Sequence, residues 1–169
     1  MKRTLAIAIV SSFCAACQAG GGSGATATLK DGQGATVGTA TFAAAGEGVT
    51  IEVDVKGLAP GEHGIHLHDT GKCDGPKFES AGAHLNPANA QHGLENPSGP
   101  HAGDMPNLKV EADGSAKATL TAKTAKLDDT SIFKSGGTAL VIHSKPDDHK
   151  TDPSGNSGDR VVCGVIERS

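Results

Sequence analysis

The segment Val49-Thr50-Ile51-Glu52-Val53-Asp54-Val55-Lys56 alternates apolar and polar residues at every position. Successive side chains of a β-strand point to opposite faces of the sheet, so this alternation predicts a strand with one buried face. Similar segments lie on both sides of it, separated by turn signals such as Asp31-Gly32 and Asp113-Gly114. The predicted strands are 26–30, 35–43, 49–56, 64–68, 108–112, 116–122, 138–143 and 160–167. Because helical periodicity is almost absent after residue 16, we predict an all-β domain, an antiparallel sandwich or barrel of eight short strands.

Two connections between these strands are much longer than the others. Residues 69–107 are rich in glycine, proline and asparagine, and residues 144–159 are polar. Loops of this length without secondary structure are usually either functional or disordered. His84, His92, His101 and Asp104 all lie in the first loop, and His143 lies directly before the second. We therefore interpret both loops as functional.

Residues 1–16 have the pattern of an export signal. Lys2 and Arg3 are followed by an apolar run over 5–10 and then by small residues, and the run is too short to be a permanent membrane-spanning helix. A flexible glycine-rich tether over 17–25 and one folded domain over 26–169 complete the predicted organisation. The protein is therefore expected to be exported, to a bacterial periplasm or cell envelope.

Cys17 leaves two alternatives for maturation. Ala15-Ala16-Cys17 is similar to the bacterial lipobox, in which an acylated cysteine becomes the new N-terminus, although Cys14 stands where such signals usually have leucine. Stable attachment to a membrane would need more than one acyl chain. The alternative is ordinary cleavage near Ala19, which leaves a soluble protein.

The other two cysteines, Cys73 and Cys163, lie in the folded domain and have only each other as partners. In an oxidising compartment they are expected to form a disulfide, and the alternative is a pair of buried free thiols. A bridge would close a loop of about 90 residues, which is worth roughly 4–5 kcal/mol in the chain-entropy treatment of unfolded chains.

Charge and composition argue against nucleic acid as a partner. The full chain carries a formal charge of −4, and without Lys2 and Arg3 it has 13 basic and 19 acidic residues, a charge of −6. No basic stripe is present, and the chain has no tryptophan or tyrosine and only four phenylalanines for stacking on bases.

Three histidines are predicted to meet on the outside of the barrel wall. His66 and His68 are two residues apart in a predicted strand and therefore share one face, while the apolar residues between and before them face the core. The same alternation turns His143 outward at the end of its strand. Imidazole groups suit copper and zinc alike, and an all-nitrogen set of low coordination suits copper(II).

The first long loop adds a second set of metal ligands. His84, His92, His101 and Asp104 supply three imidazoles and one carboxylate, which is a complete tetrahedral set for a structural zinc ion. Binding of the metal would also order a loop that is otherwise too polar and too long to hold its shape.

Several of these motifs, in this order and spacing, resemble the copper/zinc superoxide dismutases. The resemblance covers roughly residues 26–167. It rests on Gly64-Ile65-His66-Leu67-His68, Ala81-Gly82-Ala83-His84-Leu85-Asn86-Pro87, His101-Ala102-Gly103-Asp104 and Gly155-Asn156-Ser157-Gly158-Asp159-Arg160-Val161-Val162-Cys163-Gly164-Val165-Ile166. It implies a Greek-key β-barrel with two long functional loops and one copper and one zinc ion per subunit. It also implies that Cys73 and Cys163 correspond to the family's disulfide.

The resemblance further implies a role for individual residues. The copper ligands would be His66, His68, His84 and His143, and the zinc ligands would be His84, His92, His101 and Asp104. His84 would bridge the two metals, and Asp147 would orient one ligand of each from outside the ligand shell. Arg160 would be the catalytic arginine that guides the superoxide anion to copper.

The implied reaction is the disproportionation of superoxide to dioxygen and hydrogen peroxide by a copper ion that cycles between two oxidation states. His84 would release reduced copper, take up a proton and later deliver it to peroxide, while zinc would hold the loop without redox chemistry. Because a net-negative protein repels superoxide, local positive charge must attract it. The acidic-then-lysine cluster of eukaryotic members is missing before Arg160. Lys77, Lys145 and Lys150 are candidates for additional attraction, and the favoured alternative for each is a solvated surface charge.

Two other functions are compatible with parts of this sequence. The first is a copper or zinc carrier on the same fold, and the second is a structural β-sandwich of the envelope with histidines scattered by chance. The complete set of six histidines, Asp104 and Arg160 favours the enzyme. His63 is predicted to be a hydrogen-bonding structural residue and His149 an exposed one. The sequence is compatible with a monomer or a homodimer.

Overall fold

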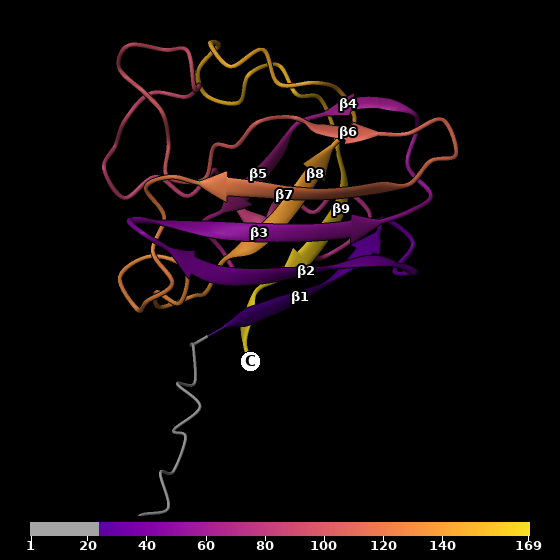
Figure 1. Ribbon diagram of the computed structural model, residues 1–169, viewed down its shortest axis with the longest axis horizontal. Coiled ribbons are helices and arrows are strands. Elements are labelled where there is room, and N and C mark those ends of the chain that lie inside the picture. Colours follow the sequence, from indigo (N-terminus) through magenta and orange to yellow (C-terminus); the bar gives the residue numbers. More distant parts are fainter. Residues whose placement is uncertain (1–23) are drawn as a thin grey trace, which may run out of the picture.

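Antiparallel strands make up nearly all regular structure in residues 24–169, which are the residues that the computed structural model describes (Figure 1). The strands are β1 (Ala25–Asp31), β2 (Thr36–Ala45), β3 (Gly48–Val55), β4 (Gly61–His63), β5 (Ile65–His68), β6 (Leu108–Val110), β7 (Ala116–Ala122), β8 (Ala139–His143), β9 (Arg160–Val165) and β10 (Glu167–Arg168). One short 3-10 helix, η1 (Glu79–Ala81), lies in the first long loop. The predicted all-β class is confirmed.

The main sheet has eight strands, seven of them in the order β5-β8-β9-β1-β2-β3-β7, with β10 paired to β1. Strand β3 shows why the sheet forms, since Val49, Ile51, Val53 and Val55 are at most 1% exposed while the polar residues between them face outward. Burial of a valine or isoleucine side chain contributes about 1.5–3 kcal/mol. The alternation therefore fixes which face of the sheet encloses the core.

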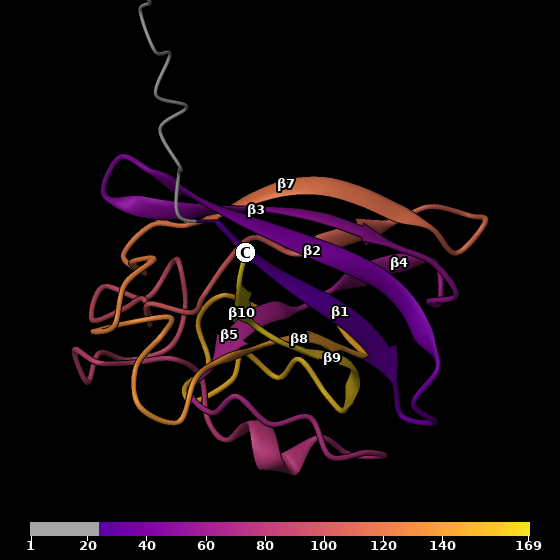
Figure 2. The same cartoon turned by 90° about the horizontal axis from the view of Figure 1, so that it is seen from below.

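A small second sheet joins the two ends of the main one. Strand β4 runs directly into β5 and strand β6 leads into β7, and β5 and β7 are the outermost strands of the main sheet. Strands β4 and β6 pair with each other, with His63 opposite Leu108. This pairing draws the two edges together, and the sheet curls around its apolar interior (Figure 2).

Each of the eight predicted segments contains a strand, and the differences lie at their ends. The structure adds β4, whose three residues are too few to show a period and follow a turn signal at Pro60. The predicted strand 160–167 is divided at Ile166, whose N–H donates to Thr138 O at 3.0 Å. Strand β6 ends at Val110 because Glu111 closes the turn to β7 through a hydrogen bond with Ser115 O.

The first long loop, 69–107, lies along the edge of β5. The N–H of Leu67 donates to Gly103 O at 3.0 Å, and the N–H of Leu85 donates to Leu67 O at 2.8 Å. A Cβ atom at Gly103 would overlap Leu67 O, so only glycine permits this approach. The loop residues are thereby held beside His66 and His68.

The predicted signal segment 1–16, Cys17 and nearly all of the tether over 17–25 lie outside the described residues. Within residues 24–169, the structure contains no helix with the length and apolar character needed to span a membrane.

Candidate metal centre

The metal centre is built on β5, whose two faces have opposite roles. Ile65 and Leu67 pack in the barrel core and are fully buried. His66 and His68 point to the other face, yet both have 0% exposure because the long loops cover them. His143, at the end of β8, is also buried and joins them. The loops therefore convert an outer wall of the barrel into an enclosed site.

The first group of side chains contains only imidazoles. Its ligand atoms all lie within 4.8 Å of one another, and its members are His66, His68, His84 and His143. Four buried ring nitrogens in this group have no hydrogen-bond partner, namely Nδ1 of His66 and Nε2 of the other three. A buried polar atom without a partner costs about 1–3 kcal/mol. These nitrogens therefore need a ligand of their own, and a copper ion suits an all-imidazole set.

The opposite nitrogens of three of these rings are hydrogen-bonded. His68 Nδ1 donates to Gly82 O at 3.0 Å, and His143 Nδ1 donates to Gly158 O at 3.3 Å. His66 Nε2 donates to Asp147 Oδ2 at 2.7 Å. Each ring is thus held in one orientation with its free nitrogen turned toward the group.

The second group combines three imidazoles with Asp104. The Nδ1 atoms of His84, His92 and His101 lie 3.0, 3.1 and 3.4 Å from Asp104 Oδ1. Bonds of 2.0–2.1 Å in a tetrahedral zinc site would separate the ligand atoms by about 3.3 Å. The spacing therefore fits zinc, and His84 belongs to both groups through its two nitrogens.

Asp147 connects the two groups. Its Oδ2 accepts the hydrogen bond from His66, and its Oδ1 accepts one from His92 Nε2 at 3.0 Å. Asn107 holds the backbone of Asp147 on both sides, donating to its carbonyl at 2.9 Å and accepting from its N–H at 2.8 Å. The predicted position of Asp147 outside both ligand sets agrees with this geometry, whereas Asn107 was not predicted.

Burial sets the protonation of most of these rings. Desolvation lowers the pKa of His66 to about 3, although its bond to Asp147 opposes the shift, and lowers the pKa of His143 to about 4. Burial also lowers the pKa of His68 well below its usual value. Burial alone would lower the pKa of His92 too, but hydrogen bonds to Asp104 and Asp147 outweigh it and raise it to about 9. His66, His68 and His143 are therefore neutral at pH 7, the state in which an imidazole can bind a metal.

Arg160 lies beside the first group. Its Nη1 donates to Phe78 O at 2.8 Å and its Nη2 donates to Gly82 O at 2.7 Å, the carbonyl that also accepts from His68. Burial lowers the pKa of Arg160, and Glu79 and Asp69 oppose that shift. The Gly82 carbonyl thus links the guanidinium to the ring of His68 through two hydrogen bonds. Arg160 is therefore not a freely solvated charge at the end of a strand.

The predicted disulfide is confirmed. Cys73 and Cys163 are bonded, with their Cα atoms 5.7 Å apart. The bond ties the first loop, near the carbonyls that hold Arg160, to the strand that begins with Arg160.

Two histidines lie outside both groups. His63 is buried and its ring nitrogens contact the carbonyls of His143 and Ala59, in agreement with the predicted structural role. The prediction that His149 is exposed is wrong, since its side chain is only 19% exposed. The second loop folds back onto the first, which brings His149 Nε2 to 3.4 Å from Asn107.

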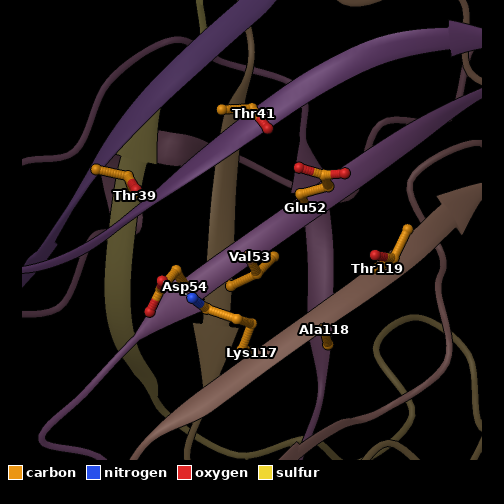
Figure 3. A pocket seen from close by; sticks show the side chains of 8 residues that line it. All are labelled: Thr39, Thr41, Glu52, Val53, Asp54, Lys117, Ala118 and Thr119. Atoms are coloured by element: carbon orange, nitrogen blue, oxygen red, sulfur yellow. Dashed lines mark ion pairs between the residues drawn. The ribbon is translucent and has the colours of Figure 1, made fainter.

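A separate hollow lies on the outer face of β2, β3 and β7 (Figure 3). Its walls are mainly threonine hydroxyls and charged side chains, and Lys117 Nζ pairs with Asp54 at 2.8 Å. No residue of either histidine group lines it. The buried groups beneath the loops are therefore the candidate functional site.

Comparison with known proteins agrees with this arrangement. Residues 36–166 match the family model described as copper/zinc superoxide dismutase (SODC). Superoxide dismutase [Cu-Zn] 2 of Aquifex aeolicus is 46% identical, covering 84% of this chain and 85% of that protein. Superoxide dismutase [Cu-Zn] of Caulobacter vibrioides is 42% identical, covering 85% of each chain.

Two solved structures have the same fold. The SOD-like protein from Bacillus subtilis superposes with a TM-score of 0.79 at 40% identity, covering 83% of this chain and 96% of that one. The Cu/Zn superoxide dismutase from Brucella abortus gives a TM-score of 0.72 at 31% identity, covering 85% and 99%. This chain belongs to the copper/zinc superoxide dismutases, enzymes that use copper and zinc to convert superoxide into dioxygen and hydrogen peroxide.

Proposed function

We propose that His66, His68, His84 and His143 hold the copper ion and that His84, His92, His101 and Asp104 hold the zinc ion. The observation that carries this assignment is that each of the four rings of the first group has a buried nitrogen without a hydrogen-bond partner. The 3.0–3.4 Å spacing around Asp104 Oδ1 supports zinc in the second.

Bound copper supplies one-electron redox chemistry, and two superoxide ions with two protons give one dioxygen and one hydrogen peroxide. His84 is the residue best placed to handle one of these protons. Its Nδ1 lies 3.0 Å from Asp104 Oδ1 while its Nε2 is free in the first group. Nε2 can therefore hold a proton in one half of the cycle and release it in the other, while Nδ1 remains with the zinc ligands.

Metal analysis tests the assignment directly. The purified protein, saturated with both metals, is expected to contain one copper and one zinc per chain and to remove superoxide. Elemental analysis and the visible copper spectrum, recorded before and after removal of zinc, measure the two sites and their link through His84. A spectrum that is unchanged when zinc leaves would contradict the bridge. A fully metallated protein without activity would favour a metal carrier.

Arg160 is proposed to attract and orient the superoxide anion. Its two hydrogen bonds to loop carbonyls keep a permanent cation beside His68. Arg160→Ala is expected to lower kcat/KM by about tenfold or more, because a fixed charge at a site entrance raises the rate of anion association by about that factor. Arg160→Lys is expected to retain part of this rate. The measurement is pulse radiolysis at low and high salt.

Arg168→Ala is the matched control for this arginine, since Arg168 pairs with Asp129 and lies over the Phe133 ring. It is expected to leave kcat/KM unchanged, and metal content should be equal in all variants. Equal rates for Arg160→Ala and the wild type would exclude the proposed role.

We also propose that residues 1–16 direct export and that the mature protein resides in a bacterial periplasm or cell envelope. The Cys73–Cys163 disulfide supports an oxidising compartment. The mass of the mature N-terminal peptide from the native source separates an acylated Cys17 from cleavage near Ala19. A mature chain that still begins at Met1 would contradict export.

A further inference from the structure

The outer nitrogens of the ligand histidines have partners in all cases but one. A metal-bound imidazole is oriented by donating its second N–H to a carboxylate, a carbonyl or water. Asp147 serves His66 and His92, while backbone carbonyls serve His68 and His143. His84 uses both nitrogens within the two groups. Only Nε2 of His101 has no hydrogen-bond partner among the described residues, although its side chain is just 7% exposed.

The nearest carboxylate to this nitrogen belongs to Asp152 in the second loop. Asp152 Oδ1 lies 3.8 Å from His101 Nε2, and the same oxygen accepts a hydrogen bond from the backbone N–H of His92 at 2.6 Å. Asp152 Oδ1 is therefore hydrogen-bonded to the backbone of His92 and faces the ring of His101, and both histidines belong to the second group. A movement of about 1 Å would bring it within hydrogen-bond distance of that ring.

We propose that Asp152 is a positioning residue for zinc, which orients His101 through Nε2 and fixes the backbone of His92. This proposal rests on the assignment of the second group to zinc. Asp147 bonds to Nε2 of His92 and Asp152 faces Nε2 of His101, so the two aspartates serve the two zinc imidazoles that do not belong to the first group. The carboxylate of Asp152 is half exposed, which gives it room to move toward His101.

The negative charge of Asp152 has a second effect on the ring. A carboxylate that accepts the Nε2 proton of His101 makes the opposite nitrogen, Nδ1, a more basic ligand. Nδ1 is the atom that faces Asp104 and His84 in the second group. Asp152 is therefore expected to strengthen zinc binding without contact to the metal, and to affect the first group much less.

Zinc affinity of two variants tests the proposal. Asp152→Ala removes both the charge and the acceptor for His92, and is expected to weaken zinc binding by about 10–100-fold, as substitutions of such outer partners do. Asp152→Asn keeps an acceptor for the His92 N–H but loses the charge, and is expected to fall between Asp152→Ala and the wild type. Competition with a chromophoric chelator measures zinc, and a separate titration measures copper, which should change by less than about threefold.

Asp159→Asn provides a charge-matched control. Asp159 lies in the same loop, and its side chain makes no hydrogen bond or ion pair within residues 24–169. It is expected to bind zinc like the wild type. Loss of zinc affinity in this control equal to that in Asp152→Ala would show a general charge effect and overturn the proposal.

Nuclear magnetic resonance of the zinc-loaded protein gives a readout that loop stability alone would not change. With nitrogen-15 in the histidines, the Nε2 proton of His101 is expected to be visible and slow to exchange in the wild type, and to exchange fast in Asp152→Ala. If the wild type binds no zinc, the site assignment itself fails. If it binds zinc and Asp152→Ala binds it equally well with a protected His101 proton, only the role of Asp152 fails.

Discussion

His143→Ala is expected to abolish superoxide disproportionation while zinc remains bound. His143 belongs to the all-imidazole group and contributes no atom to the second group, which consists of His84, His92, His101 and Asp104. Substitution of an outer partner already costs about 10–100-fold in metal affinity or activity, so loss of a direct ligand is expected to lower activity by more than about a hundredfold. Activity of the copper- and zinc-saturated variant and its content of each metal are the two measurements.

His149→Asn is the matched control for this prediction. His149 lies six residues further along the chain, its side chain is 19% exposed, and it belongs to neither metal group. Asparagine tolerates its positive φ of 59°. This variant is expected to keep its copper, its zinc and most of its activity. A His143→Ala protein that turns over superoxide at the wild-type rate, or that loses zinc together with copper, would show that the two groups are assigned wrongly.

Replacement of both Cys73 and Cys163 by serine is expected to lower the free energy of unfolding by roughly 4–5 kcal/mol. The disulfide closes a loop with a sequence separation of 90, and loss of so long a constraint increases the entropy of the unfolded chain accordingly. Activity is also expected to fall, because the bond holds the loop whose carbonyls fix Arg160. Denaturant unfolding of both proteins, with metals bound, measures the difference.

A reducing agent supplies the control for the cysteine variant. Reductant is expected to destabilise the wild type toward the value of the double variant and to leave the double variant itself unchanged. Thiol reagents are expected to label neither cysteine in the folded wild-type protein. Equal stability of the two proteins in the absence of reductant, or rapid labelling of both cysteines, would refute a stabilising bridge.

The sequence predicted those parts of the fold that depend on side-chain periodicity. Strand β3 was identifiable because eight residues alternate without interruption, and the bounds 69–107 and 144–159 of the two loops agree with the structure. Strand β4 was missed because three residues carry no detectable period. The burial of His149 was also missed, since it depends on how one loop packs against another and not on local pattern.

The two groups of candidate metal ligands could be named from the sequence because imidazole and carboxylate side chains are visible in it, and the family motifs suggested their grouping. Partners that act through the backbone were not predictable. Phe78 and Gly82 hold Arg160 with carbonyl oxygens, which every residue type possesses. Asp152 is one of four aspartates in the loop 144–159, and only the three-dimensional structure distinguishes the one that faces His101.

The carbonyl oxygen of Gly82 accepts hydrogen bonds from both His68 and Arg160. Every amino acid carries such an oxygen, so the acceptor at this junction does not depend on the identity of a side chain, whereas its two donors are the side chains of His68 and Arg160. The separation between the Arg160 guanidinium and the His68 ring is therefore set by the path of the main chain at Gly82. As the sequence diverges, this separation is expected to persist while the loop keeps its path, which the positive φ of 76° at Gly82 favours with glycine, and while His68 and Arg160 are retained.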